Sequence, residues 1–179
     1  MNSSADQNNL QVTIIGVGYV GLVSAVGLAE TGHRVICMIR DRTNFELLQR
    51  GRSPIYEPGL ERLMRRNMKN GRMIFTMDKQ WAIQSSRLIM IAVGTPQDHH
   101  GRANLSAIWS GGRDIAQNIR GHATVIIKST VPVGTNHSLQ RRMKTSLCDP
   151  KASFDIASNP EFLREGLAVH DFLHPDRVV

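Results

Sequence analysis

A glycine-rich turn contains the residues whose types and spacing point most clearly to chemistry. It follows an apolar β-branched run, Val12–Ile15, and opens a helical stretch, Val20–Thr31. In such a turn the first glycine permits a sharp bend, the second lets the backbone approach a pyrophosphate, and the third lets the helix pack closely on the strand. The free amides and the positive end of the helix then face the phosphates. A glycine-rich turn without a ligand is the alternative. We predict a dinucleotide-binding turn, made by Gly16, Val17, Gly18, Tyr19, Val20 and Gly21.

The end of the second strand candidate decides how an adenosine would be bound. The fingerprint places an acidic residue about 20 positions after the glycines, where it bonds the ribose. Here that position holds Ile39, followed by Arg40, Asp41 and Arg42. Asp41 replaces the acid if the strand ends two residues late. Otherwise the two arginines bind a 2′-phosphate, which favours NADP over NAD, or they are solvated and the adenosine site is weak.

Two later loops place small hydroxyl residues beside glycine and proline. One is Gly94-Thr95-Pro96, directly after Val93, and the other is Lys128–Thr135, which includes Thr130. Open α/β sheets bind their ligands at the carboxyl ends of strands, so these loops suit contact with a ribose or a phosphate. Taken alone, each is typical of an ordinary turn.

Two glutamates follow the last strand candidate. Glu161 and Glu165 stand four residues apart, with Arg164 between them. Such a set could position a polar substrate or assist proton transfer. As an isolated pattern it is typical of the start of a helix with surface charges.

Short apolar runs alternate with helical stretches along the whole chain. The strand candidates are Val12–Ile15, Val35–Ile39, Met73–Thr76, Leu88–Val93, Thr124–Ile127 and Phe154–Ala157. The helix candidates are Val20–Thr31, Thr43–Arg50, Gly59–Asn70, Leu105–Arg120 and Thr135–Ser146, and Asn104 is placed to cap the fourth. This alternation predicts an α/β fold, a Rossmann-type doubly wound parallel sheet with helices on both faces. We expect residues 1–10 to form a flexible tail and residues 11–179 to form one dinucleotide-binding domain.

Length and composition exclude several classes of protein. The 179 residues suffice for one domain with a core, and 41% hydrophobic residues exclude general disorder. No apolar run approaches the roughly 20 residues of a membrane span, and the first residues lack a secretory signal. Two cysteines, Cys37 and Cys148, cannot form a disulfide framework, and His99 with His100 lacks further ligands for a metal site. We therefore expect a cytoplasmic protein without a metal and without a membrane partner.

The positive charge is concentrated in one segment. The formal net charge is +7, and residues 40–72 alone contribute +5. This segment has little aromatic interleaving and no zinc-finger or RNA-binding signature. We expect no nucleic-acid partner, and phosphate-bearing small ligands or solubility explain the charge.

The ordered motifs resemble the UDP-glucose/GDP-mannose dehydrogenase family of nucleotide-sugar dehydrogenases. From about Gln11 to the end the chain reads GVGYVGL, ETGHRVIC, SPIYEPGL, AVGTP, KSTVPVGT, SNPEFLREG and HPDRVV. KSTVPVGT and NPEFLREG are far more specific than the glycine fingerprint, and VPVGT is more similar to the UDP-glucose branch. The resemblance implies NAD as cofactor and UDP-glucose as substrate. Such enzymes oxidise the sugar C6 alcohol twice, through a cysteine-bound thiohemiacetal and thioester, to the uronic acid.

The resemblance also implies roles for matching residues. Gly16–Gly21 would hold the pyrophosphate, and Val93, Gly94 and Thr95 would line the cofactor site. Thr130 would lie near the nicotinamide and organise the catalytic water, and Glu161 would hold that water or act as base. Phe162, Leu163 and Arg164 would contact the nucleotide sugar, and Glu165 would lie near the cofactor.

Two departures from the family pattern limit this transfer. Ile39 stands where the family has an acid and Asn44 where it has a basic residue, so two adenosine contacts are missing. The family's nucleophilic cysteine and its dimerisation helix belong to a second half that these residues do not match. We expect this chain alone to be inactive, and full-length members to be homo-oligomers. The last residues, Val178 and Val179, are β-branched like the start of another strand.

Overall fold

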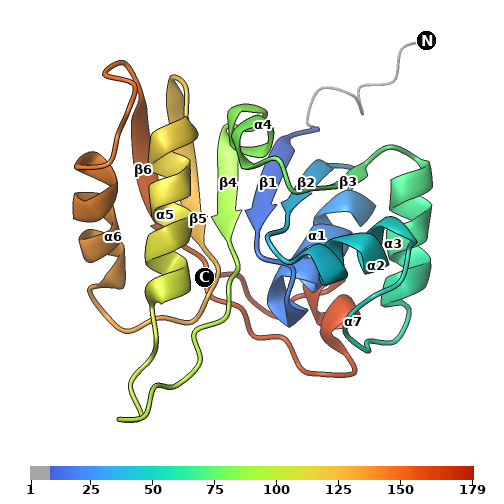
Figure 1. The fold of residues 1–179 in the computed structure, drawn as a ribbon. Helices are drawn as coiled ribbons and strands as arrows, with labels where there is room; N and C mark the ends of the chain where they lie inside the picture. The colour runs from blue at the N-terminus through green and yellow to red at the C-terminus, as the bar shows by residue number, and fades with distance from the viewer. Residues whose placement is uncertain (1–8) are drawn as a thin grey trace.

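A six-stranded parallel sheet forms the centre of the molecule in the computed structural model, which describes residues 9–179 (Figure 1). Its order is β3-β2-β1-β4-β5-β6, and every neighbouring pair is parallel. The strands are β1 (Gln11–Ile15), β2 (Arg34–Met38), β3 (Met73–Thr76), β4 (Leu88–Ile91), β5 (His122–Ile127) and β6 (Ser153–Ser158). This order confirms the predicted doubly wound Rossmann-type fold.

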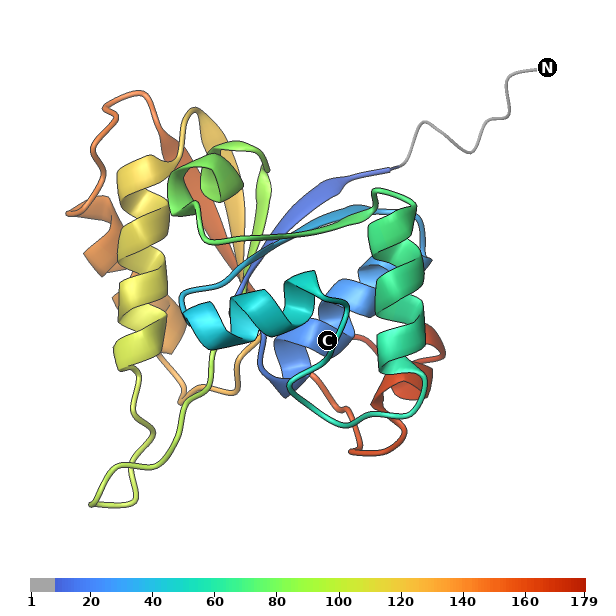
Figure 2. The same cartoon turned by 45° about the vertical axis from the view of Figure 1, so that its right-hand side comes forward.

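Helices cover both faces of the sheet. They are α1 (Tyr19–Glu30), α2 (Arg42–Gln49), α3 (Leu60–Lys69), α4 (Lys79–Gln84), α5 (Ser106–Asn118), α6 (Thr135–Lys144) and α7 (Ala168–Leu173). Figure 2 shows α1, α2, α3 and α7 on one side of the molecule, and α5 and α6 on the other. The loop between β4 and α5 projects beyond the carboxyl ends of the strands (Figure 1).

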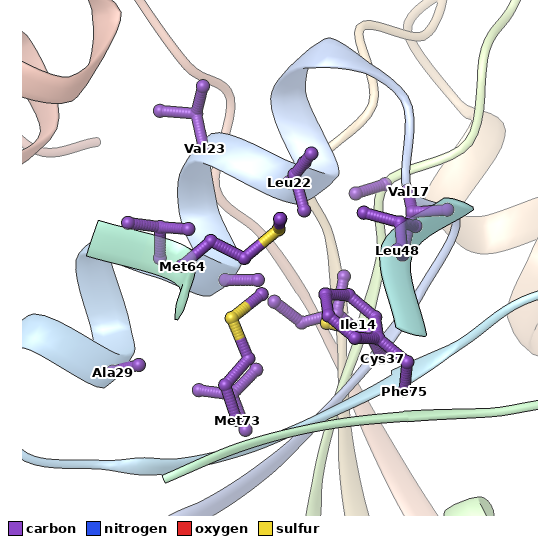
Figure 3. Close-up of a cluster of buried hydrophobic side chains, with 14 of the residues drawn as sticks. Ile14, Val17, Leu22, Val23, Ala29, Cys37, Leu48, Met64, Met73 and Phe75 are labelled. Atoms are coloured by element: carbon purple, nitrogen blue, oxygen red, sulfur yellow. The ribbon is translucent and has the colours of Figure 1, made fainter. Parts of the chain in front are cut away.

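Side chains of alternate strand residues build a separate core on each face, because successive residues of a strand point to opposite sides. On the α1 face Ile14 and Cys37 pack with Met64 of α3 and Phe75 of β3 (Figure 3). On the other face Ile15 is one of a second cluster formed with residues of α5 and α6. Burial on both faces explains why the central strands read as continuous apolar runs.

Most predicted elements are present, with their ends displaced by one or two residues. The prediction missed α4 and α7, which have only six residues each and are too short to show a helical period. Asp78 marks the start of α4, since its side chain accepts a hydrogen bond from the amide of Trp81 at 2.9 Å. The expectation that Asn104 caps α5 is wrong in position, because the N-cap is Leu105; Asn104 Oδ1 accepts from the Ser106 amide at 3.0 Å from one residue earlier.

The described chain begins just before β1 and contains helices of moderate length. The predicted flexible tail, residues 1–10, falls mostly outside the described residues, and β1 begins at Gln11. Within residues 9–179, no helix has the length and apolar character that a bilayer span demands.

Candidate nucleotide-binding site

A cavity of about 530 Å³ opens at the carboxyl ends of β1 and β4. The chain leaves these two neighbouring strands toward opposite faces of the sheet, and ligands of open α/β folds bind at such a switch point. The cavity is lined by Ile15, Gly16, Val17, Gly18, Met38, Ile39, Arg40, Asp41, Asn44, Pro54, Ile55, Ala92, Val93, Gly94 and Ala107. It therefore unites the glycine turn, the end of β2 and the end of β4.

The three glycines of the turn have different surroundings. Gly16 has a φ of 98°, and a Cβ there would lie 2.7 Å from the carbonyl oxygen of Ala92. A Cβ on Gly21 would collide with the carbonyl oxygen of Gly16, so this glycine allows α1 to pack against the turn. Gly18 has open space where a Cβ would lie, on the cavity side of the turn. These are the three roles of a dinucleotide-binding turn.

The amino end of α1 is free of competing acceptors. Gly18 is the N-cap and has no side chain that could bond the first amides, and the first turn contains no acidic residue. Tyr19, Val20 and Gly21 form this first turn behind the cavity lining. Backbone amides and the helix dipole would therefore hold a pyrophosphate here, so the site fits a dinucleotide.

At the adenosine end of the cavity, an acidic residue from α5 pairs with the nearest arginine and with a lysine. Arg40 Nη2 lies 2.7 Å from Asp114 Oδ2, and Lys79 Nζ lies 3.0 Å from Asp114 Oδ1. Arg42 pairs with Glu46 at 3.0 Å and does not line the cavity. Only Arg40 of the two arginines is therefore at the site, and it shares the single carboxylate of Asp114 with Lys79.

Asp41 lies at the cavity as the N-cap of α2. Its Oδ1 accepts a hydrogen bond from the Asn44 amide at 2.7 Å, and both residues line the cavity. The strand does not extend to Asp41, because β2 ends at Met38 and the amide of Ile39 makes the last bond to Thr76. The alternative in which β2 ends two residues late, so that Asp41 replaces the missing acid at the strand end, is therefore wrong. Asp41 reaches the cavity from the start of a helix instead.

Hydroxyl groups join the loops that follow β4 and β5. Thr95 Oγ1 donates to the carbonyl oxygen of Thr130 at 2.9 Å, and Ser129 Oγ donates to that of Val93 at 2.7 Å. Val93 and Gly94 line the cavity, whereas Thr95 and Thr130 lie outside its lining. These bonds hold Thr130 against the loop that follows β4, residues 93–95.

A second cavity, of about 490 Å³, contains the predicted substrate residues. Glu161, Phe162, Leu163 and Arg164 line it together with Asn159, Lys128 and residues of α1, α7 and the last described turn. Glu161 follows β6 by three residues, as Thr130 follows β5, and Ile127 pairs with Ser158 at the ends of these strands. The fold thus brings both predicted catalytic residues to neighbouring strand ends.

Two of the charged groups of this second cavity have polar partners within it. Lys128 is largely buried and its Nζ donates to Asn159 Oδ1 at 3.0 Å. Burial lowers the pKa of Lys128, and the carboxylate of Glu161 partly opposes that shift. Arg164 binds Asp171 of α7 through two hydrogen bonds of 2.7 and 3.0 Å, and these lower the pKa of Asp171 to about 2.

The remaining predicted cofactor contact lies apart from both linings. Glu165 is exposed and belongs to neither cavity in this structure. Neither of the two described cysteines lines a cavity, although Cys37 directly precedes Met38, which lines the first one. Cys37 is buried in β2, which raises the pKa of its thiol, and Cys148 is exposed beyond α6.

Glu57 belongs to this region and was missed from the sequence. It stands in the loop between α2 and α3, is 6% exposed, and accepts hydrogen bonds from the Tyr19 hydroxyl and from the Gly166 amide at 2.8 Å. Burial and the neighbouring carboxylate of Glu57 raise the pKa of Tyr19 to about 12. The SPIYEPGL motif was the available signal, but no pattern near it indicated a partner 109 residues away.

Comparison with known proteins agrees with this geometry. The profile of the UDP-glucose/GDP-mannose dehydrogenase family, NAD binding domain, matches residues 10–179. A UDP-glucose 6-dehydrogenase of Rhizobium meliloti is 45% identical over 171 residues, which are 95% of this chain and 39% of that protein. UDP-glucose 6-dehydrogenase YwqF of Bacillus subtilis is 45% identical over 170 residues, 95% of this chain and 38% of that protein. The chain thus spans about two fifths of the length of these relatives.

Solved structures show the same fold. A UDP-glucose dehydrogenase from Pyrobaculum islandicum superimposes with a TM-score of 0.91 at 38% identity, over 97% of this chain and 40% of that one. A GDP-mannose dehydrogenase from Pseudomonas aeruginosa, solved as a ternary complex, gives a TM-score of 0.88 at 36% identity, over 93% of this chain and 39% of that one.

Proposed function

This chain belongs to the UDP-glucose/GDP-mannose dehydrogenase family, and from that premise we propose that its 530 Å³ cavity binds NAD(H) in a nucleotide-sugar dehydrogenase. The single observation that carries the proposal is the uncapped amino end of α1 at the switch point, beside an open Gly18. NAD⁺ bound here would supply the hydride acceptor for oxidation of the substrate alcohol. The chain itself supplies amides for the pyrophosphate and an apolar wall for the rings.

The charges around the adenosine end favour NAD over NADP. The guanidinium of Arg40 is already engaged by Asp114, although Asp114 also binds Lys79, so the preference rests mainly on Asp41. The carboxylate of Asp41 lines the same end, and only one of its oxygens is used to cap α2. The other oxygen can accept from ribose hydroxyls, whereas a phosphate there would meet a like charge.

For the substrate we propose UDP-glucose, with GDP-mannose as the second candidate. Two relatives carry the first name, and the Pseudomonas structure carries the second. In the second cavity Glu161 would hold the water or act as base, and Arg164 would contact the nucleotide sugar. Thr130, three residues after the neighbouring strand β5, would help to organise that water. The product would be the uronic acid. Since neither described cysteine lines a cavity, we propose that these residues alone do not complete the oxidation.

Calorimetric titration with NAD⁺, NADH, NADP⁺ and NADPH tests the cofactor assignment. We expect NAD(H) to bind more tightly than NADP(H). The variant Gly18→Ala should weaken binding without loss of stability, because its Cβ occupies the open cavity side of the turn. Gly111→Ala in α5 is the matched control, since a Cβ there has ordinary contacts at 3.8 Å and lies outside the cavity. Tighter NADP(H) binding, or equal binding by the two variants, would overturn the proposal.

A further inference from the structure

We propose that Glu57 is a positioning residue whose buried carboxylate couples the dinucleotide-binding turn to the segment that carries Glu161 and Arg164. The inference rests on the proposed function, because it links the cofactor cavity to the substrate segment. It assigns Glu57 no contact with either ligand. Its role is to fix where residues 161–169 lie relative to α1.

The hydrogen bonds of Glu57 join three parts of the chain. Oε2 accepts from the Tyr19 hydroxyl of α1 and from the Gly166 amide at 2.8 Å, and Oε1 accepts from the Val169 amide of α7 at 3.5 Å. The Gly166 amide also lies 3.3 Å from the Tyr19 hydroxyl oxygen. One carboxylate therefore attaches the loop after β6, the start of α7 and the first turn of α1 to each other.

The burial of this charge requires a reason. Glu57 is 6% exposed, and in the described part of the chain its partners are a phenol and backbone amides rather than a cation. An apolar residue would pack there without the desolvation penalty of a carboxylate. Buried, hydrogen-bonded charges of this kind are concentrated where geometry has to be exact. The site between two cavities is such a place.

Tyr19 connects the cofactor turn directly to this carboxylate. Its backbone opens α1 next to Gly18, so its amide belongs to the helix end that faces a pyrophosphate. Its hydroxyl is bonded to Glu57. A phosphate that binds the first turn of α1 therefore acts on the backbone of Tyr19. The side chain of Tyr19 is connected through Glu57 to the loop that contains Gly166.

The loop that carries Glu57 also contacts the cofactor cavity. Pro54 and Ile55 line that cavity, three and two residues before Glu57. The loop is fixed to α3 by two hydrogen bonds. Glu61 Oε1 accepts from the Ser53 amide at 2.9 Å, and the backbone carbonyl oxygen of Glu57 accepts from the Leu60 amide at 3.2 Å. The same short loop, residues 53–57, therefore lines the cofactor cavity and binds the segment that follows β6.

Hydrogen–deuterium exchange of the whole chain, with and without NADH, tests the coupling. We expect Glu57→Gln to speed exchange of amides 164–169 about tenfold or more, since it removes charged hydrogen bonds to two of them. In the unchanged protein NADH should slow exchange at residues 16–21 and also at 164–169. In Glu57→Gln the first protection should remain and the second should disappear. Glu46→Gln, an exposed carboxylate in α2, is the control and should behave as the unchanged protein.

Each outcome decides one proposal. Unchanged exchange at 164–169 in Glu57→Gln, or NADH protection there that persists in the variant, overturns the positioning role. Absence of NADH protection at 164–169 in the unchanged protein, with protection at 16–21 present, overturns the coupling. If NADH protects neither region, the proposed cofactor function fails, while the ligand-free comparison still tests the attachment. Should Glu57→Gln unfold, Tyr19→Phe replaces it, with faster ligand-free exchange at 164–169 as the required result.

Discussion

The glycine turn and the segment after β6 lie near the same edge of the sheet but are held in different ways. The turn is continuous with a buried strand and a twelve-residue helix, with Gly21 packed against Gly16 and Gly16 against Ala92 beyond the neighbouring strand β4. The segment 159–173 is partly buried or exposed, with Ala168 alone fully buried, and depends on a few distant contacts, with Glu57 at its middle and Phe172 against Gly27 near its end. Contacts between residues close in sequence therefore order much of the first region, whereas contacts with distant residues order the second.

The largest effect is expected where the turn is most closely packed. Gly21→Ala would place a Cβ against the carbonyl oxygen of Gly16, which is backbone and cannot move aside. We expect a loss of about 3 kcal/mol in the free energy of unfolding, at the upper end of overpacking costs. Urea denaturation measures it, with Gly111→Ala in α5 as the control that leaves stability unchanged or higher. Equal midpoints for the two variants would show that the turn is not close-packed.

Removal of the α7 anchor should have a smaller and more local effect. Phe172 is half-buried and occupies the space beside Gly27. Phe172→Ala should lower stability by about 1–2 kcal/mol, less than for a fully buried ring, and should speed amide exchange in residues 159–173. The control is Phe162→Ala, because that ring is 60% exposed. A uniform increase in exchange over the whole chain would contradict the separation of the two regions.

We expect cofactor preference in the first region to depend on the carboxylate of Asp41. Asp41→Asn keeps a side chain that can cap α2 but removes the carboxylate from the cavity. The ratio of NADH to NADPH affinity should fall about tenfold, as expected for loss of a charged hydrogen bond to a ribose hydroxyl. Parallel titrations measure this ratio, and Arg42→Gln, outside the cavity lining, should leave it unchanged. An unaltered ratio in Asp41→Asn would exclude the carboxylate as the selective group.

The smallest effect concerns the titration of Tyr19. Burial and Glu57 raise the pKa of Tyr19 to about 12, so the folded protein retains a proton that the unfolded chain releases near pH 10. Stability from this group is complete below about pH 10 and is lost as the pH rises toward 12. The chain has two tyrosines, and Tyr56 is exposed, so Tyr56→Phe isolates the signal of Tyr19. Tyrosinate absorbance in that variant should appear only well above pH 10, and ionisation near pH 10 would refute the contact with Glu57.

Local patterns explain which parts of the molecule the sequence could predict. The glycine fingerprint, the strand before it and the helix after it are contiguous, so the turn, the sheet and the position of the cavity followed from spacing alone. The contacts of Arg40 with Asp114 and of Glu57 with Gly166 join residues 74 and 109 positions apart. No period or propensity encodes such pairs, because they arise only when crossovers bring the elements together. The short helix α7 is held by the same kind of contact, and its six residues are too few to show a helical period in the sequence.

The comparison of the two regions is tested most directly by mapping where NADH binds. Amide exchange of the unchanged protein should show the strongest NADH protection at residues 16–21, 39–41 and 93–94, which build the switch-point cavity. Protection at 164–169 should be weaker, because it is transmitted through Tyr19 and Glu57. Strongest protection at residues 159–164, with 16–21 unaffected, would place the dinucleotide in the second cavity and contradict the account.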